Sequence, residues 1–185
     1  MIIILLSVVV ILLIILLWAV FASNNLIAQR NRVKQCRSGI CVALKQRNDM
    51  IPNLVATAKA YMGYENEILS RIVELRTKAA TGSESDQIKG GTEISSLLGQ
   101  LHVAVEDYPE LKANEQFVNL QRQIVEMENE IQAIRRTYNA AITDYNNGIE
   151  MFPSSVIASM RSHQQLELLD FPECEIKEIK VRDLF

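Results

Sequence analysis

The sequence is poor in the residues that interrupt helices. It holds seven glycines and four prolines among its 185 residues, which is too few for the closely spaced turns of an all-β fold. Aromatic residues make up 6% of the chain although hydrophobic residues make up 49%, so the apolar side chains are mostly aliphatic. These shortages favour long helices around a modest core.

Residues that carry chemistry are also scarce. The two histidines, His102 and His163, lie far apart in the sequence and have no partner at a spacing typical of a catalytic base. Cys36, Cys41 and Cys174 are an odd number at no metal-binding spacing, so we expect neither a disulfide framework nor a zinc site. The formal net charge of −3 gives no basic excess for nucleic acid. We expect no enzymatic activity, no cofactor, no metal and no small-molecule substrate.

The chain does contain one long apolar run, at its N-terminus. Ile2 to Ala22 carries no charge and would be about 31 Å long as a helix, enough to cross the hydrocarbon core of a bilayer. Trp18 and Phe21 stand near its end, as interfacial aromatic residues do. The run predicts a transmembrane anchor over residues 1–22. A cleaved signal peptide is the alternative, although no basic residue precedes the run and the run is long for such a peptide.

Basic residues follow the apolar run and predict its orientation. They are Arg30, Arg32, Lys34 and Arg37. The positive-inside bias places them in the cytoplasm, with the N-terminus outside a cell (inner) membrane crossed once. Arg30, Lys34 and Arg37 also share one helical face, so they are candidates for contact with lipid phosphates at the membrane surface. The alternative is that they determine topology and nothing more.

A heptad pattern dominates the C-terminal half. It predicts one helix over residues 114–151, about 58 Å long, with an apolar core seam formed by Phe117, Ile124, Ile131, Tyr138, Tyr145 and Phe152. A second row lies three residues behind the first and consists of Leu120, Met127, Ile134, Ala141 and Gly148.

Three further helices are expected, over residues 23–48, 52–80 and 92–107. The first continues from the anchor, and Asp49, Pro52 and Asn53 mark the helix corner because proline disfavours helix at the preceding residue. The polar, glycine-containing stretch 81–92 predicts a loop. The predicted fold is all-α: a transmembrane helix continuing into an antiparallel up-down four-helix bundle with coiled-coil-like packing over 23–160, then a tail over 161–185.

Some polar residues interrupt or flank the apolar faces. Glu65 stands in the apolar row of residues 52–80, so we expect it either to pair with Arg135 or Arg136 or to reach water at a bundle end. Glu128, Arg135 and Asn139 lie beside the core seam. Our hypothesis is that these residues form a polar contact that sets the register between helices. The alternative is that they are solvated charges at the edge of the seam.

Several short motifs resemble those of the LemA family. They are Asp49–Val55 (DMIPNLV), Tyr108–Phe117 (YPELKANEQF), Arg135–Asn139 (RRTYN) and Phe152–Ala158 (FPSSVIA), within a similarity over residues 24–158. The resemblance implies a membrane protein with a short outer N-terminus and a cytoplasmic helical bundle. The family has no assigned enzymatic activity and includes magnetosome membrane proteins. Tyr64, where histidine is common, and the C-terminal tail depart from the family pattern.

Two main functional classes follow. The first is a non-enzymatic, membrane-anchored scaffolding protein that assembles as a homo-oligomer in the lipid bilayer. The second is an adaptor or regulator that binds another membrane protein, for example a protease, through the long helix or the C-terminal tail. A third class, a secreted helical domain, would require cleavage of the apolar run.

Overall fold

A computed structural model describes residues 1–63 and 67–169 of the chain. Within these residues every regular element is helical, so the all-α class is confirmed. The elements are α1 (Ile2–Met62), α2 (Glu67–Thr81), α3 (Glu84–Ala104), the 3-10 helix η1 (Val105–Asp107), α4 (Pro109–Lys112), α5 (Glu115–Glu150) and α6 (Ser154–Met160).

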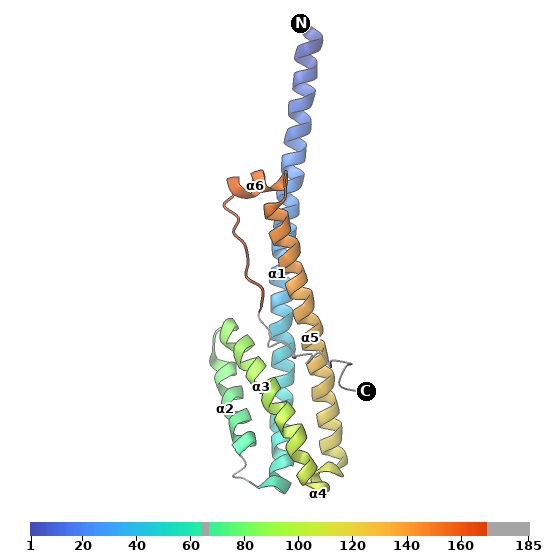
Figure 1. The fold of residues 1–185 in the computed structure, drawn as a ribbon, viewed down its shortest axis with the longest axis vertical. Coiled ribbons are helices and arrows are strands. Elements are labelled where there is room, and N and C mark those ends of the chain that lie inside the picture. Colours follow the sequence, from blue (N-terminus) through green and yellow to red (C-terminus); the bar gives the residue numbers. More distant parts are fainter. Residues whose placement is uncertain (64–66, 170–185) are drawn as a thin grey trace, which may run out of the picture.

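Helix α1 is the longest element and joins the apolar span to the bundle. Its 61 residues extend about 92 Å, and α5 packs along the part of α1 that follows the apolar span (Figure 1). The side chains of residues 2–17 are exposed, whereas burial begins at Ala22 and continues at Leu26, Val33 and Ile40. The predicted continuation of the apolar span into the helical domain is therefore confirmed.

Helix α5 matches the predicted long helix to within one residue at each end. Asn114 caps its start, because its Oδ1 accepts a hydrogen bond of 2.9 Å from the backbone N–H of Phe117. The seam residues are buried at positions 117, 124, 131, 138 and 145. Placing Phe152 in the seam was wrong: it lies beyond the end of α5 and is 83% exposed, because the chain turns at Met151–Pro153.

The two halves of the helical domain are built differently. In the half distant from the apolar span, α2 packs mainly on α3 (Figure 1), and α3 packs on α1. Side chains of α3 also reach α5. In the half near the span, α1 and α5 continue together and contact α6. The predicted four-helix bundle along the whole domain is therefore not confirmed.

An extended segment, the C-terminal strap (residues 163–169), covers α5 where α3 does not reach. Asn146 accepts from the backbone N–H of Leu166 and donates to its carbonyl, at 3.0 and 2.9 Å. Asn139 makes the same pair with Leu169, at 3.0 and 3.1 Å. Asn139 and Asn146 are seven residues apart on a helix, and Leu166 and Leu169 are three residues apart in an extended segment. Both separations are about 10 Å, so each amide lies opposite one leucine of the strap. The polar contact of Asn139 is thus with the backbone of Leu169 in the strap and not with a side chain of another helix.

The predicted corner at Asp49, Pro52 and Asn53 was wrong, because α1 continues through Pro52 to Met62. Proline has no N–H, so it leaves the carbonyl four residues earlier without its helical donor. The Nε of Arg76 in α2 donates to that carbonyl, the one of Asn48, at 2.9 Å. The reversal comes instead at Gly63, whose φ of 81° suits a residue without a side chain. The predicted helix 52–80 is therefore divided between α1 and α2.

The predicted loop over residues 81–92 was also largely wrong. Helix α3 begins at Glu84 with a capping box, in which Ser83 accepts from the backbone N–H of Asp86 and Asp86 accepts from that of Ser83. Gly90 and Gly91 therefore lie inside α3. The capping residues offset the low helix propensity of the glycines.

We expect the Arg76 hydrogen bond to stabilise α1 only because Pro52 is present. Arg76→Met should lower the free energy of unfolding by about 1 kcal/mol by leaving the Asn48 carbonyl without its donor. In a Pro52→Ala background the helix supplies its own N–H, and the loss should be less than half as large. Thermal unfolding of the detergent-solubilised chain measures both. Lys78→Met, at an exposed position of α2, is the control, and equal losses in the two backgrounds would contradict the explanation.

Candidate functional site

The most deeply buried polar group in the distal half belongs to Arg47 of α1, which is 0% exposed. Arg47 continues the heptad row of buried apolar residues Leu26, Val33 and Ile40, and Leu54 follows it seven residues later. An arginine in such a row is a recognisable signal. Arg47 is not among the residues predicted from the sequence, because nothing in its own segment shows which acidic residue it meets.

Arg47 joins three helices through a partly buried polar network. Its Nη1 donates to Glu128 Oε1 of α5 at 2.6 Å and to Ser95 Oγ of α3 at 2.7 Å. The Ser95 hydroxyl lies 2.8 Å from Glu128 Oε2, to which it donates. The three side chains form a closed ring, in which the guanidinium supplies donors and the carboxylate accepts from both partners.

Arg135 of α5 lies beside this ring and is also buried. Its Nη2 donates to Thr92 Oγ1 of α3 at 3.2 Å. Burial lowers the pKa of Arg135, the charge of Arg47 lowers it further, and Glu128 partly opposes both effects. The structure thus places Glu128 and Arg135 in contacts with α1 and α3, with Arg47 and Thr92 as their partners.

Two further residues, Arg136 and Glu65, were predicted to set the register. Arg136 is exposed on α5. Glu65 lies outside the described residues, so its predicted pairing stays a prediction.

The composition of the network favours a structural role. A serine, a carboxylate and a guanidinium hold one another here, and neither histidine takes part: His102 contacts Gln121, and His163 Nδ1 lies 2.9 Å from the hydroxyl of Tyr145. Among residues 1–63 and 67–169, no three His, Cys, Asp or Glu side chains gather where they could hold a metal ion. A buried ion pair contributes little net stability but penalises any shift that separates its members. The network therefore fixes the register of α1, α3 and α5.

An apolar groove opens next to the network, between α3 and α5. This α3–α5 groove has a volume of about 260 Å³, and Ser95 and Glu128 are among the residues that line it. Its apolar lining residues are Leu54, Leu98, Leu101, Phe117, Ile124 and Val125. Val118 and Val125, seven residues apart on α5, are 46% and 50% exposed.

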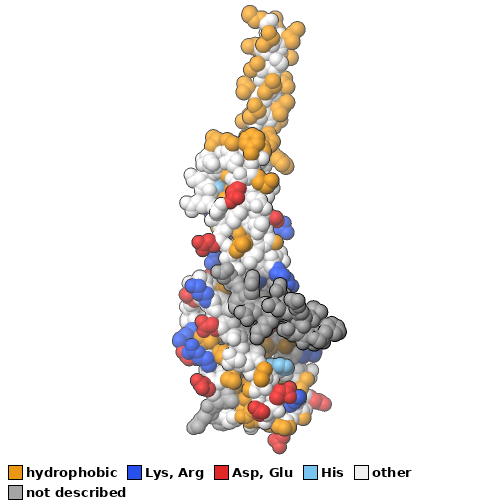
Figure 2. Space-filling view, in the orientation of Figure 1, with side chains coloured by type: hydrophobic (Ala, Val, Ile, Leu, Met, Phe, Trp, Pro, Cys, Tyr) orange, Lys and Arg blue, Asp and Glu red, His pale blue; other side chains and the backbone are white. Residues whose placement is uncertain are grey.

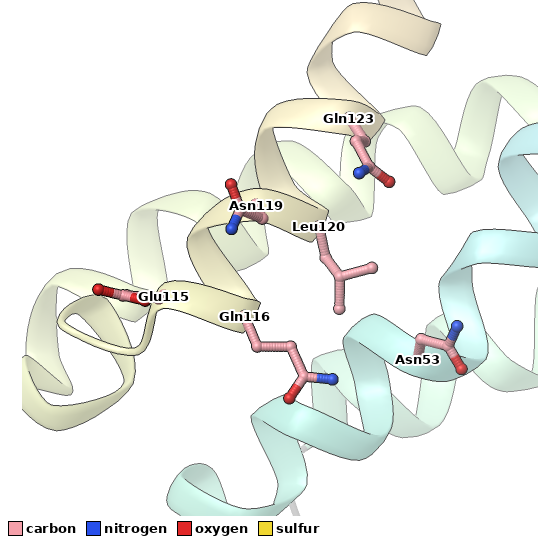
Figure 3. Close-up of a pocket in the computed structure, with 6 residues that line it drawn as sticks. All are labelled: Asn53, Glu115, Gln116, Asn119, Leu120 and Gln123. Atoms are coloured by element: carbon pink, nitrogen blue, oxygen red, sulfur yellow. The ribbon is translucent and has the colours of Figure 1, made fainter.

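A second, open recess lies between α1 and the start of α5 (Figure 3). Leu120 points toward α1, and the amides of Asn53 and Gln116 lie on either side of it. Glu115 is the one ionisable residue of the six that line the recess, and its side chain points away from it. Asn53, predicted at a helix corner, thus faces α5 from within α1.

The predicted membrane-surface basic residues separate into two groups. Arg30, Arg32 and Lys34 are exposed on α1, whereas the Nε of Arg37 lies 3.1 Å from Glu84 Oε2 at the start of α3. Glu84 also accepts from the thiol of Cys41 at 3.5 Å. Burial first, and then Glu84, raises the pKa of Cys41 to about 11, so this thiol is protonated at neutral pH.

Comparison with known proteins agrees with this architecture. The model of the LemA family matches residues 37–182. The chain belongs to the LemA family. It is 28% identical to Protein LemA of Metamycoplasma hominis over 163 residues, which cover 87% of this chain and 72% of that protein. It is 25% identical to Magnetosome protein MamQ 2 of Paramagnetospirillum magneticum over 78% of this chain and 63% of the relative.

The relatives and the apolar helix together indicate a membrane protein. Within the described part of this LemA-family chain, one helix, Ile2–Met62, is long and apolar enough at its N-terminal end to cross a membrane. The family motif at Asp49–Val55 lies within α1 and includes Leu54, whose side chain lines the α3–α5 groove.

Removing the charge of Glu128 should destabilise the domain. Glu128→Gln keeps the shape of the side chain but leaves Arg47 without its anion, and we expect a loss of about 3 kcal/mol in the free energy of unfolding. Glu126→Gln is the matched control two residues away, since the exposed Glu126–Arg122 pair should contribute less than about 0.5 kcal/mol. Chemical denaturation in detergent measures both, and equal effects would show that the network is not needed for stability.

Gly91 of α3 should not tolerate a side chain. A Cβ there would lie 2.7 Å from Leu44 Cδ2 and 3.5 Å from Arg47 Nη2, and Leu44 is buried. We expect Gly91→Ala to cost about 1–3 kcal/mol through overpacking. A Cβ at Gly99 on the same helix meets nothing within 4 Å, so Gly99→Ala should be neutral or stabilise by up to about 1 kcal/mol. If Gly91→Ala and Gly99→Ala shift the melting temperature in the same direction, the close packing of α3 on Leu44 at Gly91 is contradicted.

Proposed function

We propose that this LemA-family protein is a non-enzymatic scaffold that is anchored in the membrane and assembles side by side with further copies through the distal part of α5. The observation that carries the proposal is the exposed row formed by Val118 and Val125, seven residues apart, beside the apolar α3–α5 groove. Apolar residues at this spacing form a stripe along one helical face.

Membrane anchoring restricts how two copies can meet. Because each copy carries its own apolar span, neighbouring copies stand parallel, and identical residues lie at equal heights. A two-fold interface between such copies is isologous, so a given patch meets itself. A valine row that runs along a helix parallel to the span satisfies this condition. Confinement to one bilayer raises the effective concentration, so a small patch is sufficient.

The charges around the valine row are self-complementary. Arg122 and Glu126 lie on the same exposed face of α5 and form a 2.8 Å pair within one copy. In a parallel dimer, Arg122 of each copy would lie near Glu126 of the other, so the intramolecular pair can be exchanged for two pairs between copies. Such pairs contribute to the register of an interface more than to its affinity.

The same reasoning gives the orientation of the assembly. With the basic residues Arg30, Arg32 and Lys34 on the cytoplasmic side, the helical domain extends into the cytoplasm and the N-terminus lies outside the inner membrane. These three exposed residues are also the ones near enough to the span to contact lipid phosphates, whereas Arg37 is engaged by Glu84.

An adaptor function is the second candidate, and the α3–α5 groove favours it. A groove lined by Leu98, Phe117 and Ile124 and bordered by polar residues suits the apolar face of a helix from another membrane protein. In this case the valine row would be the edge of a site for a different chain.

Site-directed cross-linking in native membranes tests the proposal. In a background with Cys36, Cys41 and Cys174 replaced by alanine, Val118→Cys and Val125→Cys should each give a cross-linked dimer of this chain with a short bis-maleimide. Val42→Cys, at an exposed position of α1 away from the groove, should give at least fivefold less dimer. Native mass measurement after gentle detergent extraction should show a defined homo-oligomer.

The competing outcomes differ clearly. If the two α5 positions give no more dimer than Val42→Cys, self-assembly through this face is wrong. If they cross-link instead to a chain of different mass, the adaptor function replaces the scaffold.

A further inference from the structure

A group of apolar side chains is exposed at the end of the helical domain where the apolar span leaves it. The group comprises Phe152 (83% exposed), Met160 (78%), Met151 and Val156. All four belong to α6 or to the turn before it, and α6 lies crosswise at the foot of the span (Figure 1). In water, four neighbouring apolar residues exposed to this extent would be costly.

The position of α6 relative to the span is defined by direct neighbours. Pro153 and Ser154 line a small recess of about 180 Å³ together with Trp18 and Phe21 of α1. Residues 2–21 of α1 extend about 30 Å, which is the thickness of the hydrocarbon core. Phe21 therefore stands near the boundary of that core, and the start of α6 lies at the same height.

The composition of this segment suits the same boundary. From Met151 to Met160 there is no charged side chain, and the first charges on either side are Glu150 and Arg161. Three serines, Ser154, Ser155 and Ser159, supply the hydroxyl groups of the segment. Figure 2 shows hydrophobic side chains over the span and at its foot, and charged side chains farther down the domain.

The opposite side of α6 is attached to the helical domain. Ala158 is buried, and Ile157 packs against the core formed by α1 and α5. The backbone N–H of His163 donates to the carbonyl of Ala158 at 3.0 Å. Since Ile157 and Ala158 fix one side of α6 to the domain, the exposed side chains of Val156 and Met160 point away from the domain at the foot of the span.

We propose that Met151–Met160 is a second membrane contact, in which Phe152, Val156 and Met160 enter the boundary between lipid headgroups and acyl chains. The proposal rests on membrane anchoring by α1 but not on self-assembly. Helices of this kind bind in the plane of the interface through their apolar side chains. A span and an interfacial helix together give two points of attachment, which restrict the tilt of α1 and hold the distal groove at a fixed height above the membrane.

Tryptophan quenching by brominated lipid tests this contact. The chain has one tryptophan, Trp18, so a Trp18→Phe background is free of tryptophan. Full-length chains carrying Phe152→Trp or Met160→Trp are reconstituted in phosphatidylcholine vesicles with or without 6,7-dibrominated acyl chains. Both positions are exposed, so a larger aromatic side chain should not disturb folding. We expect brominated lipid to reduce the emission of each variant at least twofold.

Two controls separate this proposal from the anchoring on which it rests. Val103→Trp, in the same background, places the probe at an exposed position of α3 at the distal end of the domain and should show no quenching. The parental chain, with Trp18 alone, should be strongly quenched if the span is inserted. Loss of that quenching would overturn membrane anchoring and the second contact with it.

Two results would overturn the second contact alone. One is that brominated lipid quenches Trp18 but leaves the tryptophans at positions 152 and 160 as unquenched as the tryptophan at position 103. The other is emission from positions 152 and 160 that is shifted to the blue but insensitive to bromine, since a protein surface, such as a second copy, would then cover this face.

Discussion

The continuity of α1 is the constraint on which the rest of the structure depends. One helix serves both as the apolar span and as the central helix of the domain, so every element that packs on it has a fixed height relative to the span. Pro52 lies inside this helix, and Arg76 of α2 supplies the hydrogen-bond donor that the Asn48 carbonyl lacks there. Because α2 provides that arginine, the distal half of the domain supports the helix that carries it.

Register along α1 is determined by polar contacts rather than by apolar ones. A heptad seam of aliphatic side chains repeats every seven residues, whereas Arg47, Glu128 and Ser95 can all bond to one another in only one register. In the half near the span, Asn139 and Asn146 fix the register of the strap. Each amide side chain accepts a hydrogen bond from the backbone N–H of one strap residue and donates one to the carbonyl of the same residue. The groove and α6 thus lie at opposite ends of the paired helices α1 and α5.

The sequence predicted the elements whose signals are local and periodic. The apolar span and α5 followed from composition and heptad spacing, and Asn114 marked the start of α5. The errors lie where a distant residue overrides a local signal. Pro52 did not end the helix, and the carbonyl that it leaves without a helical donor accepts from Arg76, far along the chain. The glycine-containing stretch 81–92 did not form a loop because Gly91 allows α3 to approach Leu44 and Arg47 closely.

The sequence by itself therefore determined the all-α class, the apolar N-terminal span and the course of α5, because hydrophobic periodicity is encoded within each segment. Its short motifs indicated the family. Only the tertiary structure decided that Arg47 is the partner of Glu128, that the strap replaces α3 near the span, and that Phe152 is exposed beside the span rather than buried in the seam. These features depend on which segments meet in space. The pairing of a donor on one helix with an acceptor on another leaves no periodic trace in either segment.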